Sequence, residues 1–345
     1  MKTEFGDSKM GYIDLHCDTV SRIMQSDCAT LKDNDFMINY TGMKHAGTDV
    51  QFFACFLYAL YFDDYLSEED KKKDYCLLDI NSDAWDKAYE YALYMSDKLD
   101  YLMDDDIKPA VSFKDIINNK ENGGISAVKT IEEGGIINGC LSRINDLYNR
   151  GVRLITLTWN FKNCIGYPNS KDPEHMEKGL TPFGLDAIER MNDLGIIIDV
   201  SHLSDGGFDD CIRYSRYPIC ASHSDARALC GHPRNLTDKM LRTLGEHGGV
   251  AGLNFCPEFL RDDGLVSVDD QVKHILYMIN KGGEDVVALG SDFDGITNPY
   301  MDNWTNTVND MPLLFDALKK AGLKERQMDK LMFGNAMRLI KDNWK

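Results

Sequence analysis

Short apolar runs alternate with longer amphipathic stretches along most of the chain. The apolar runs are rich in β-branched and aromatic residues, which favours strands, and the stretches between them carry apolar residues at helical spacing. Strands that alternate with helices predict a parallel sheet, and eight of them predict an α/β protein with a closed (β/α)₈ (TIM) barrel. We expect these strands at residues 12–17, 51–58, 128–132, 154–159, 196–201, 218–222, 250–255 and 286–291.

One long segment, residues 63–106, interrupts this alternation. Its residues 68–73 are all charged, and a helical pattern of apolar residues follows at Trp85, Ala88 and Met95. We interpret the segment as an expanded helical connection after the second strand. No internal repeat or low-complexity linker marks a boundary, so we expect residues 1–345 to form a single barrel domain.

Charge and cysteine usage narrow the class of protein. The net charge of −18 repels phosphate backbones and anionic head groups, which argues against nucleic-acid and membrane partners. Residues 1–10 are polar, and the chain has no run of about 18 apolar residues, so we expect neither a secretory signal nor a membrane span. The ten cysteines are scattered without a C-x-x-C pair, which is typical of reduced thiols in a cytoplasmic protein.

Residues that bind metals occur where several predicted strands end. Residues two apart on a strand point to the same side, so His16 and Asp18 converge at the end of the first strand. The carboxyl ends of barrel strands meet at one mouth, where barrel enzymes carry their active sites. Acids or histidines follow four more strands, namely Glu132 and Glu133, His202, His223, and Asp292 with Asp294. The other histidines lie in loops or helical stretches and are expected to be ordinary polar residues: His45, His175, His232, His247 and His274.

Such a set of side chains can hold two divalent metal ions. His16 and Asp18 would bind one ion, His202 and His223 the other, and a glutamate carboxylate would bridge them. Mixed histidine and carboxylate ligation suits zinc best, although manganese or cobalt could occupy the same site. Asp292 follows the last strand, where it could take a proton from a metal-activated water and pass it to a leaving amine.

The order of motifs along the chain resembles that of the membrane dipeptidase (renal dipeptidase) family, peptidase family M19, in its soluble bacterial form. The resemblance covers nearly the whole chain. Its motifs are Ile13-Asp-Leu-His-Cys-Asp-Thr19, Glu-Gly-Gly, Gly151-Val-Arg-Leu-Ile-Thr-Leu-Thr158, Asp-Val-Ser-His, Ser222-His-Ser224, Pro233-Arg-Asn235, Asp292-Phe-Asp-Gly295 and Gly334-Asn-Ala-Met-Arg338.

The resemblance implies an amidohydrolase-like barrel with two zinc ions that hydrolyses dipeptides by means of a metal-bridging hydroxide. By position, His16 and Asp18 would bind one zinc, and His202 and His223 the other. Arg234 would pair with the C-terminal carboxylate of the substrate, and Asp292 would be the catalytic acid and base. The family also implies tolerance of a D-residue at the C-terminal position, hence L,D-dipeptides as substrates, and pairing as a homodimer.

Two positions leave alternatives open. Matching Glu-Gly-Gly literally selects Glu133 as the bridging ligand, whereas counting back without gaps from the strand at 154–159 selects Glu132, which we prefer. Trp159 stands where the mammalian pattern has a histidine that contacts the reacting carbonyl. An indole can donate one hydrogen bond but cannot become a cation, so Trp159 would weaken that contact or form an apolar wall.

Two other functions compete with dipeptide hydrolysis. The first keeps the metals and changes the substrate to another amide, such as an N-acyl amino acid. The second is a catalytically silent barrel that keeps its metal for structure. Trp159 alone supports the silent barrel, and the retained Asp292 counts against it.

Overall fold

The computed structural model describes residues 11–67, 69, 73–296 and 300–344. Residues 1–10, on which the expectation of no secretory signal rests, lie outside the described residues, as does most of the charged run at 68–73. Among the helices in the described part, none combines the length and the apolar composition that a membrane crossing requires.

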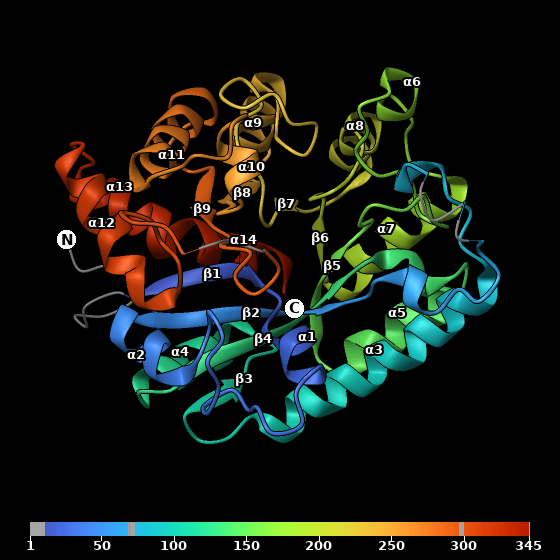
Figure 1. Cartoon of the computed structure of the whole chain (residues 1–345), viewed down its shortest axis with the longest axis horizontal. Coiled ribbons are helices and arrows are strands. Elements are labelled where there is room, and N and C mark those ends of the chain that lie inside the picture. The colour runs from blue at the N-terminus through green and yellow to red at the C-terminus, as the bar shows by residue number, and fades with distance from the viewer. Residues whose placement is uncertain (1–10, 68, 70–72, 297–299, 345) are drawn as a thin grey trace.

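Nine parallel strands form one sheet in the order β2-β1-β9-β8-β7-β6-β5-β4-β3, and the pairing of β2 with β4 closes it (Figure 1). The barrel therefore consists of eight strands, β1, β2 and β4 to β9, which confirms the predicted fold class. The strands are β1 (Tyr12–Cys17), β2 (Thr48–Phe56), β3 (Ile107–Pro109), β4 (Ile125–Glu132), β5 (Val152–Thr156), β6 (Ile197–Asp199), β7 (Cys220–Ala221), β8 (Val250–Leu253) and β9 (Val287–Leu289).

The ninth strand, β3, was not predicted. It has only three residues and pairs with Ile125–Ala127 at the beginning of β4, beside the barrel wall. Three residues that include Lys108 and Pro109 are too short and too polar to stand out as an apolar run. The predicted strand at 154–159 also runs too far, because β5 ends at Thr156 and the next residues turn into the loop above the barrel.

Helices surround the barrel, and the long helix α3 follows the connection after β2 (Figure 1). α3 covers the helical pattern expected there, with Trp85, Ala88 and Met95 buried on one face. The assignment of residues 1–345 to a single domain stays a prediction. The α-helices are α1 (Thr19–Met24), α2 (Tyr40–Ala46), α3 (Ser82–Leu102), α4 (Phe113–Glu121), α5 (Leu141–Asn149), α6 (Pro173–Met176), α7 (Pro182–Leu194), α8 (Asp205–Tyr214), α9 (Asp238–Glu246), α10 (Pro257–Leu260), α11 (Val268–Gly282), α12 (Met311–Lys320), α13 (Glu325–Asp329) and α14 (Asn335–Asn343). Short 3₁₀ turns are η1 (Ala59–Tyr61), η3 (Tyr75–Leu77), η4 (Gly134–Ile137) and η5 (Val308–Asp310), and η6 (Lys330–Gly334) is a π-helical turn before α14.

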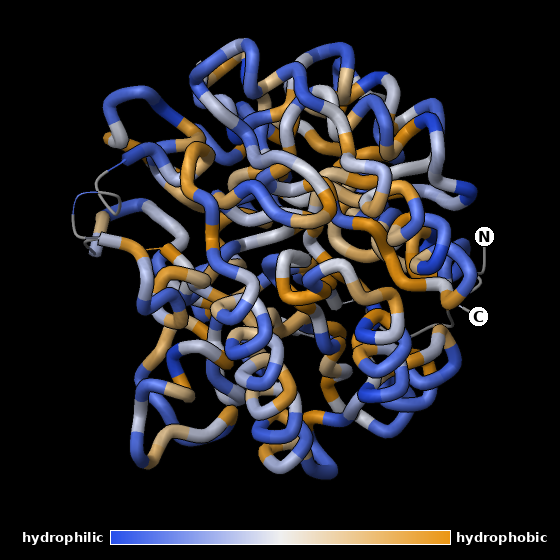
Figure 2. The backbone as a smooth tube through the Cα atoms, turned by 90° about the vertical axis from the view of Figure 1, so that its right-hand side faces the viewer, coloured by the Kyte–Doolittle hydropathy of each residue, from blue (hydrophilic) through white to orange (hydrophobic). Residues whose placement is uncertain are grey.

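Two hydrophobic cores divide the interior. The larger core lies between the barrel and the outer helices, which alternate between hydrophilic and hydrophobic residues along their length (Figure 2). The smaller core receives at least one side chain from every barrel strand, for example Val128 of β4, and is joined by Phe333 and Met337 from η6 and α14. Val128 lies on the same face of β4 as Glu132, so this core fills the barrel beneath the strand ends that carry the acids and histidines.

All ten cysteines are free, and six of them are buried, which agrees with the expectation of reduced thiols.

Candidate metal centre

The structure brings together six of the seven side chains predicted for the site, at the carboxyl ends of the barrel strands. All six except Asp292 are less than a tenth exposed. They are His16 and Asp18 at the end of β1, Glu132 on β4, His202 after β6, His223 after β7 and Asp292 after β9. They form three groups of mutually close ligand atoms, all within 4.8 Å: His16–Asp18–Glu132, Glu132–His202–His223 and His16–His223–Asp292.

Glu132 lies between the two pairs of predicted ligands. Its Oε2 is 3.4 Å from Nε2 of His16, which is itself 3.3 Å from Oδ2 of Asp18. Its Oε1 is 3.1 Å from Nε2 of His202 and 3.5 Å from Nε2 of His223. One carboxylate thus presents a separate oxygen to each half of the site.

Glu133, the other candidate for the bridge, turns away from these groups. Its carboxylate accepts hydrogen bonds from the backbone N–H groups of Gly135 (2.8 Å) and Trp159 (3.1 Å), and from the side-chain amide of Asn163 (2.6 Å). Burial raises the pKa of Glu133 to about 7. Glu133 therefore ties the end of β4 to the loop after β5.

A hydrogen-bond chain fixes which nitrogen of His223 carries the proton. The Ser222 hydroxyl lies 2.6 Å from Oδ2 of Asp199 and 2.7 Å from Nδ1 of His223. A carboxylate oxygen accepts, so the Ser222 hydroxyl donates to Asp199 and accepts the N–H of Nδ1. The Nε2 of His223 is then left with a lone pair that points toward Glu132 and His202.

His202 is oriented in the same way by a different group. Its Nδ1 lies 3.2 Å from Oδ1 of Asn160, an acceptor, so the proton is on Nδ1 and the lone pair is on Nε2. The two Nε2 atoms of His202 and His223 are 3.1 Å apart. Burial lowers the pKa of His202 to about 4 and that of His223 well below its usual value, so both rings are neutral.

These facing lone pairs fit a cation. Two acceptor nitrogens at hydrogen-bond distance repel each other unless a positive charge lies beside them, and neither ring has a proton to share there. The carboxylates lead to the same conclusion. Burial raises the pKa of Asp18 to about 7 and that of Asp292 to about 6, and the neighbouring Glu132 carboxylate adds to both shifts. A cation beside these carboxylates would favour their ionised forms. The buried Oδ1 of Asp18 has no hydrogen-bond partner among the described residues. The donor set is that of a divalent metal site.

Removing the Ser222 hydroxyl is expected to weaken metal binding. Without it, Nδ1 of His223 loses its acceptor, and the ring no longer has a preferred proton position or orientation. We expect Ser222→Ala to lower the affinity for zinc by about 10- to 100-fold, as measured by competition with a chelating dye.

Ser201→Ala is the matched control for this variant. The Ser201 hydroxyl is equally buried and touches Ser222, but it contacts the backbone N–H of His223 rather than the ring. We expect its zinc affinity to stay close to that of the wild type. Equal losses in both variants would contradict the role given to Ser222.

Asp292 is held by a residue that the sequence did not reveal. Asn254, directly after β8, donates from Nδ2 to Oδ2 of Asp292 (2.9 Å). The other oxygen, Oδ1, lies 3.7 Å from Nε2 of His16 and faces the cluster. Asp294, predicted beside Asp292, instead accepts hydrogen bonds from the Thr19 hydroxyl and the Met37 backbone N–H, and so anchors a loop.

The backbone at these strand ends is strained. His202 and Asp292 have positive φ angles of 67° and 61°, a region that few residues other than glycine adopt. Gly295 completes the same turn, and a Cβ placed on it would lie 2.1 Å from Oδ2 of Asp18 and 2.7 Å from Oδ1 of Asp292. Only glycine lets the chain pass this close to both carboxylates.

Arg234, the seventh predicted residue, lines the same cavity of about 850 Å³ as Asp18, Glu132, His202 and Asp292. Its side chain is buried, and one nitrogen, Nη1, donates to the Ser224 hydroxyl at 2.7 Å. Its Nε and Nη2 have no hydrogen-bond partner among the described residues. A buried guanidinium with two free N–H groups is suited to hold a carboxylate.

One of the histidines expected to be ordinary also lines this cavity. His232 packs on the Phe259 ring at 4.6 Å between centroids and accepts the backbone N–H of Arg234 through Nδ1. His232 owes this position to the loop that carries Arg234, and the expectation that it is an ordinary polar residue stays a prediction. In the sequence, only the proximity of His232 to Pro233 and Arg234 indicated that it would line the cavity.

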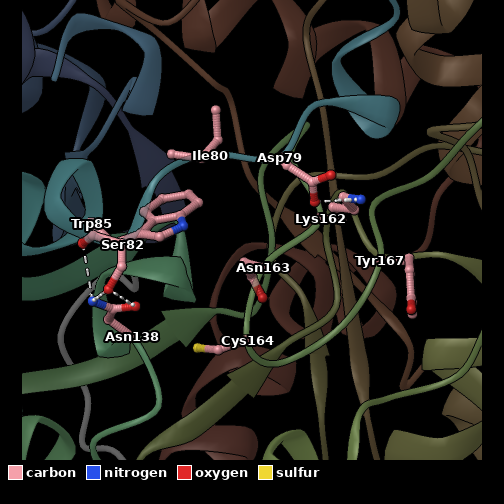
Figure 3. Close-up of a pocket in the computed structure, with 9 residues that line it drawn as sticks. All are labelled: Asp79, Ile80, Ser82, Trp85, Asn138, Lys162, Asn163, Cys164 and Tyr167. Carbon is pink, nitrogen blue, oxygen red and sulfur yellow. Dashed lines mark hydrogen bonds and ion pairs between the residues drawn. The ribbon is translucent and has the colours of Figure 1, made fainter. Parts of the chain in front are cut away.

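Another cavity, of about 370 Å³, lies beside the loop after β5 (Figure 3). None of the six clustered side chains is among its described lining residues. Its polar groups are largely paired with each other, for example Lys162 with Asp79 and Asn138 with Ser82. Asn163 connects this cavity to the carboxylate of Glu133, so it supports the barrel mouth from outside.

Comparison with known proteins gives the family. The sequence matches the membrane dipeptidase family (peptidase family M19) over residues 7–344. An uncharacterised Klebsiella pneumoniae protein of the pqqA 5′ region is 39% identical over 248 residues, which are 69% of this chain and 89% of that protein.

Two solved structures superpose on nearly the whole chain. One is a dipeptidase described as a family M19 metallopeptidase, with 27% identity and a TM-score of 0.83 over 98% of this chain and 99% of that one. The other is a Rhodobacter sphaeroides metallopeptidase with a bound phosphinate mimic of the dipeptide L-Ala-D-Ala. It has 26% identity and a TM-score of 0.83 over 98% of this chain and all of that one (100%). The chain therefore belongs to the membrane dipeptidase family, peptidase family M19, and is a metallo-dipeptidase.

Proposed function

We propose that this metallo-dipeptidase cleaves the amide bond of dipeptides at a centre of two zinc ions, and that L,D-dipeptides are among its substrates. The observation that carries the proposal is the Glu132 carboxylate, whose two oxygens face different histidines. A carboxylate in this position suits a bridge between two ions. The L,D part is supported by the Rhodobacter sphaeroides relative, which binds a mimic of L-Ala-D-Ala.

We assign His16 and Asp18 to one ion, and His202 and His223 to the other, with Glu132 shared between them. Neutral imidazoles together with carboxylates favour Zn²⁺, and Mn²⁺ or Co²⁺ would accept the same donors. When bound, two such ions supply an activated water and polarise the scissile carbonyl.

Asp292 is assigned the proton transfer. Because Asn254 holds Oδ2, the Oδ1 atom is the one that takes a proton from the attacking water and gives it to the leaving amine. Arg234 donates its free Nε–H and Nη2–H to the C-terminal carboxylate of the substrate, which restricts the site to short peptides.

Trp159 does not replace a protonated histidine in this scheme. Its ring packs edge-on against Phe56, with 5.0 Å between ring centroids, and lies 6.1 Å from the His202 ring. An indole can neither accept a proton nor carry a positive charge. We therefore assign Trp159 to the wall of the cavity and give it no part in polarising the carbonyl.

Zinc content per chain, combined with hydrolysis of L,L- and L,D-dipeptides before and after chelation, tests the proposal. We expect about two zinc ions per chain, cleavage of both dipeptide classes, loss of nearly all activity on chelation and recovery when zinc is added back. N-acyl amino acids serve as the competing substrate, because they lack the free amino group.

Each contrary outcome has its own meaning. Cleavage of N-acyl amino acids without cleavage of dipeptides would assign the chain to another amide substrate. Stoichiometric zinc without cleavage of any amide would favour the silent barrel. A chain that cannot be loaded with zinc would overturn the ligand assignments.

A further inference from the structure

The cavity of about 850 Å³ that Arg234 and the clustered side chains line is the metal-site cavity. A side pocket of about 520 Å³ opens beside it. The two share part of their walls, including Phe56 and Trp159. We call it the aromatic side pocket, and its main lining residues are Phe56, Tyr58, Phe62, Tyr91, Met95 and Trp159. Its volume lies within the range of about 300–1,000 Å³ typical of small-molecule sites.

The chemistry of this pocket is apolar. No lining side chain in the described part of the chain is charged. The Tyr58 hydroxyl is already hydrogen-bonded to the Tyr75 hydroxyl at 3.0 Å, and the Tyr58 ring packs against Trp159 at 5.5 Å between centroids. Ser21 and Gln25, which also line the metal-site cavity, are the neutral polar members of the wall. The walls otherwise consist largely of aromatic faces and thioethers, which favour an apolar or aromatic guest.

The barrel order places this pocket on one side of the metal centre. Phe56 ends β2 and Trp159 follows β5, and these two strands flank β4, which carries Glu132. Arg234 follows β7, farther around the barrel mouth. A dipeptide with its carboxylate at Arg234 and its amide at the metal centre therefore directs its N-terminal residue toward β2 and β5.

We propose that the aromatic side pocket binds the side chain of the N-terminal residue of the substrate and selects large apolar or aromatic side chains there. The inference rests on the dipeptidase function proposed above and adds the substrate class. Burial of a phenyl or large aliphatic side chain in such a pocket gives a preference over alanine of about 10- to 100-fold in kcat/KM.

Four dipeptides measured on the zinc-loaded enzyme separate the possibilities. We expect Phe-Ala to exceed Ala-Ala by about 10- to 100-fold, and Ala-Phe and Lys-Ala to lack this advantage. A preference for Ala-Phe alone would overturn the orientation, and a preference for Lys-Ala would overturn the apolar chemistry. Equal rates for Phe-Ala and Ala-Ala would overturn the inference while leaving dipeptide hydrolysis intact. Cleavage of none of the four would instead count against the proposed function.

The variant Tyr91→Ala tests the pocket directly. Tyr91 lies on α3, lines the side pocket and is absent from the lining of the metal-site cavity. We expect its loss to reduce kcat/KM for Phe-Ala by about tenfold and to leave Ala-Ala within about twofold. Tyr101→Ala is the matched control, because Tyr101 lies on the same helix, is 81% exposed and lines neither cavity. Equal effects of Tyr91→Ala on both substrates would contradict the assignment.

Discussion

Asp292→Asn is expected to lower kcat for a cleaved dipeptide by about 1,000-fold and to leave the zinc content unchanged. The amide has nearly the size of the carboxyl group, but it can neither take a proton from water nor return one to the leaving amine. Asn254 can still hydrogen-bond to its oxygen, so the side chain keeps its place. Steady-state kinetics measure kcat, and metal analysis of the same preparation measures the zinc content.

The metal analysis gives this variant a second use. Asp292 belongs to one of the three close ligand groups, with His16 and His223. If Asp292→Asn lost zinc together with activity, Asp292 would be a ligand rather than the proton carrier. An unchanged kcat would require a different group to move the proton.

Arg234→Met is expected to reduce kcat/KM for free dipeptides by at least about 100-fold. The guanidinium is buried and its Nε and Nη2 are unpaired among the described residues, so the pairing proposed with a substrate carboxylate would occur away from water. Methionine is similarly long and leaves no uncompensated charge behind. Most of the loss should appear in KM, because the carboxylate lies away from the bond that breaks.

Dipeptide amides provide the control for Arg234. They lack the carboxylate, so we expect both the wild type and Arg234→Met to cleave them slowly and at similar rates. Arg234→Lys should recover only part of the activity, since an ammonium keeps the charge without the two parallel donors. An undiminished kcat/KM for free dipeptides in Arg234→Met would place carboxylate recognition elsewhere.

The barrel could be predicted from the sequence because its strands are buried on both faces and appear as continuous apolar runs. β3 could not, since its three residues pair only with the beginning of β4. The six clustered side chains could be predicted because each lies at or shortly after the carboxyl end of a strand, and parallel strands end at one mouth. The choice between Glu132 and Glu133 was harder, because it depends on which of two adjacent acids faces inward.

The supporting residues show where sequence reasoning stops. Ser222 and Asp199 stand in recognised motifs, yet their chain to Nδ1 of His223 depends on β6 and β7 lying side by side. Asn254 follows β8 and donates a hydrogen bond to Asp292, which follows the neighbouring strand β9. The hydrogen bonds from Ser222 to Asp199 and from Asn254 to Asp292 join segments that are distant in the sequence. A single sequence does not show which distant segments lie together in space.

Gly295 has a consequence for redesign of this enzyme. The aromatic side pocket is built from side chains, so substitutions there can reshape the range of substrates while the backbone stays in place. Residue 295 offers no such freedom, because even one methyl group would displace the carboxylates of Asp18 and Asp292. Variant libraries that aim at new specificity should therefore diversify the pocket walls around β2, β5 and α3 and keep the turn after β9 fixed.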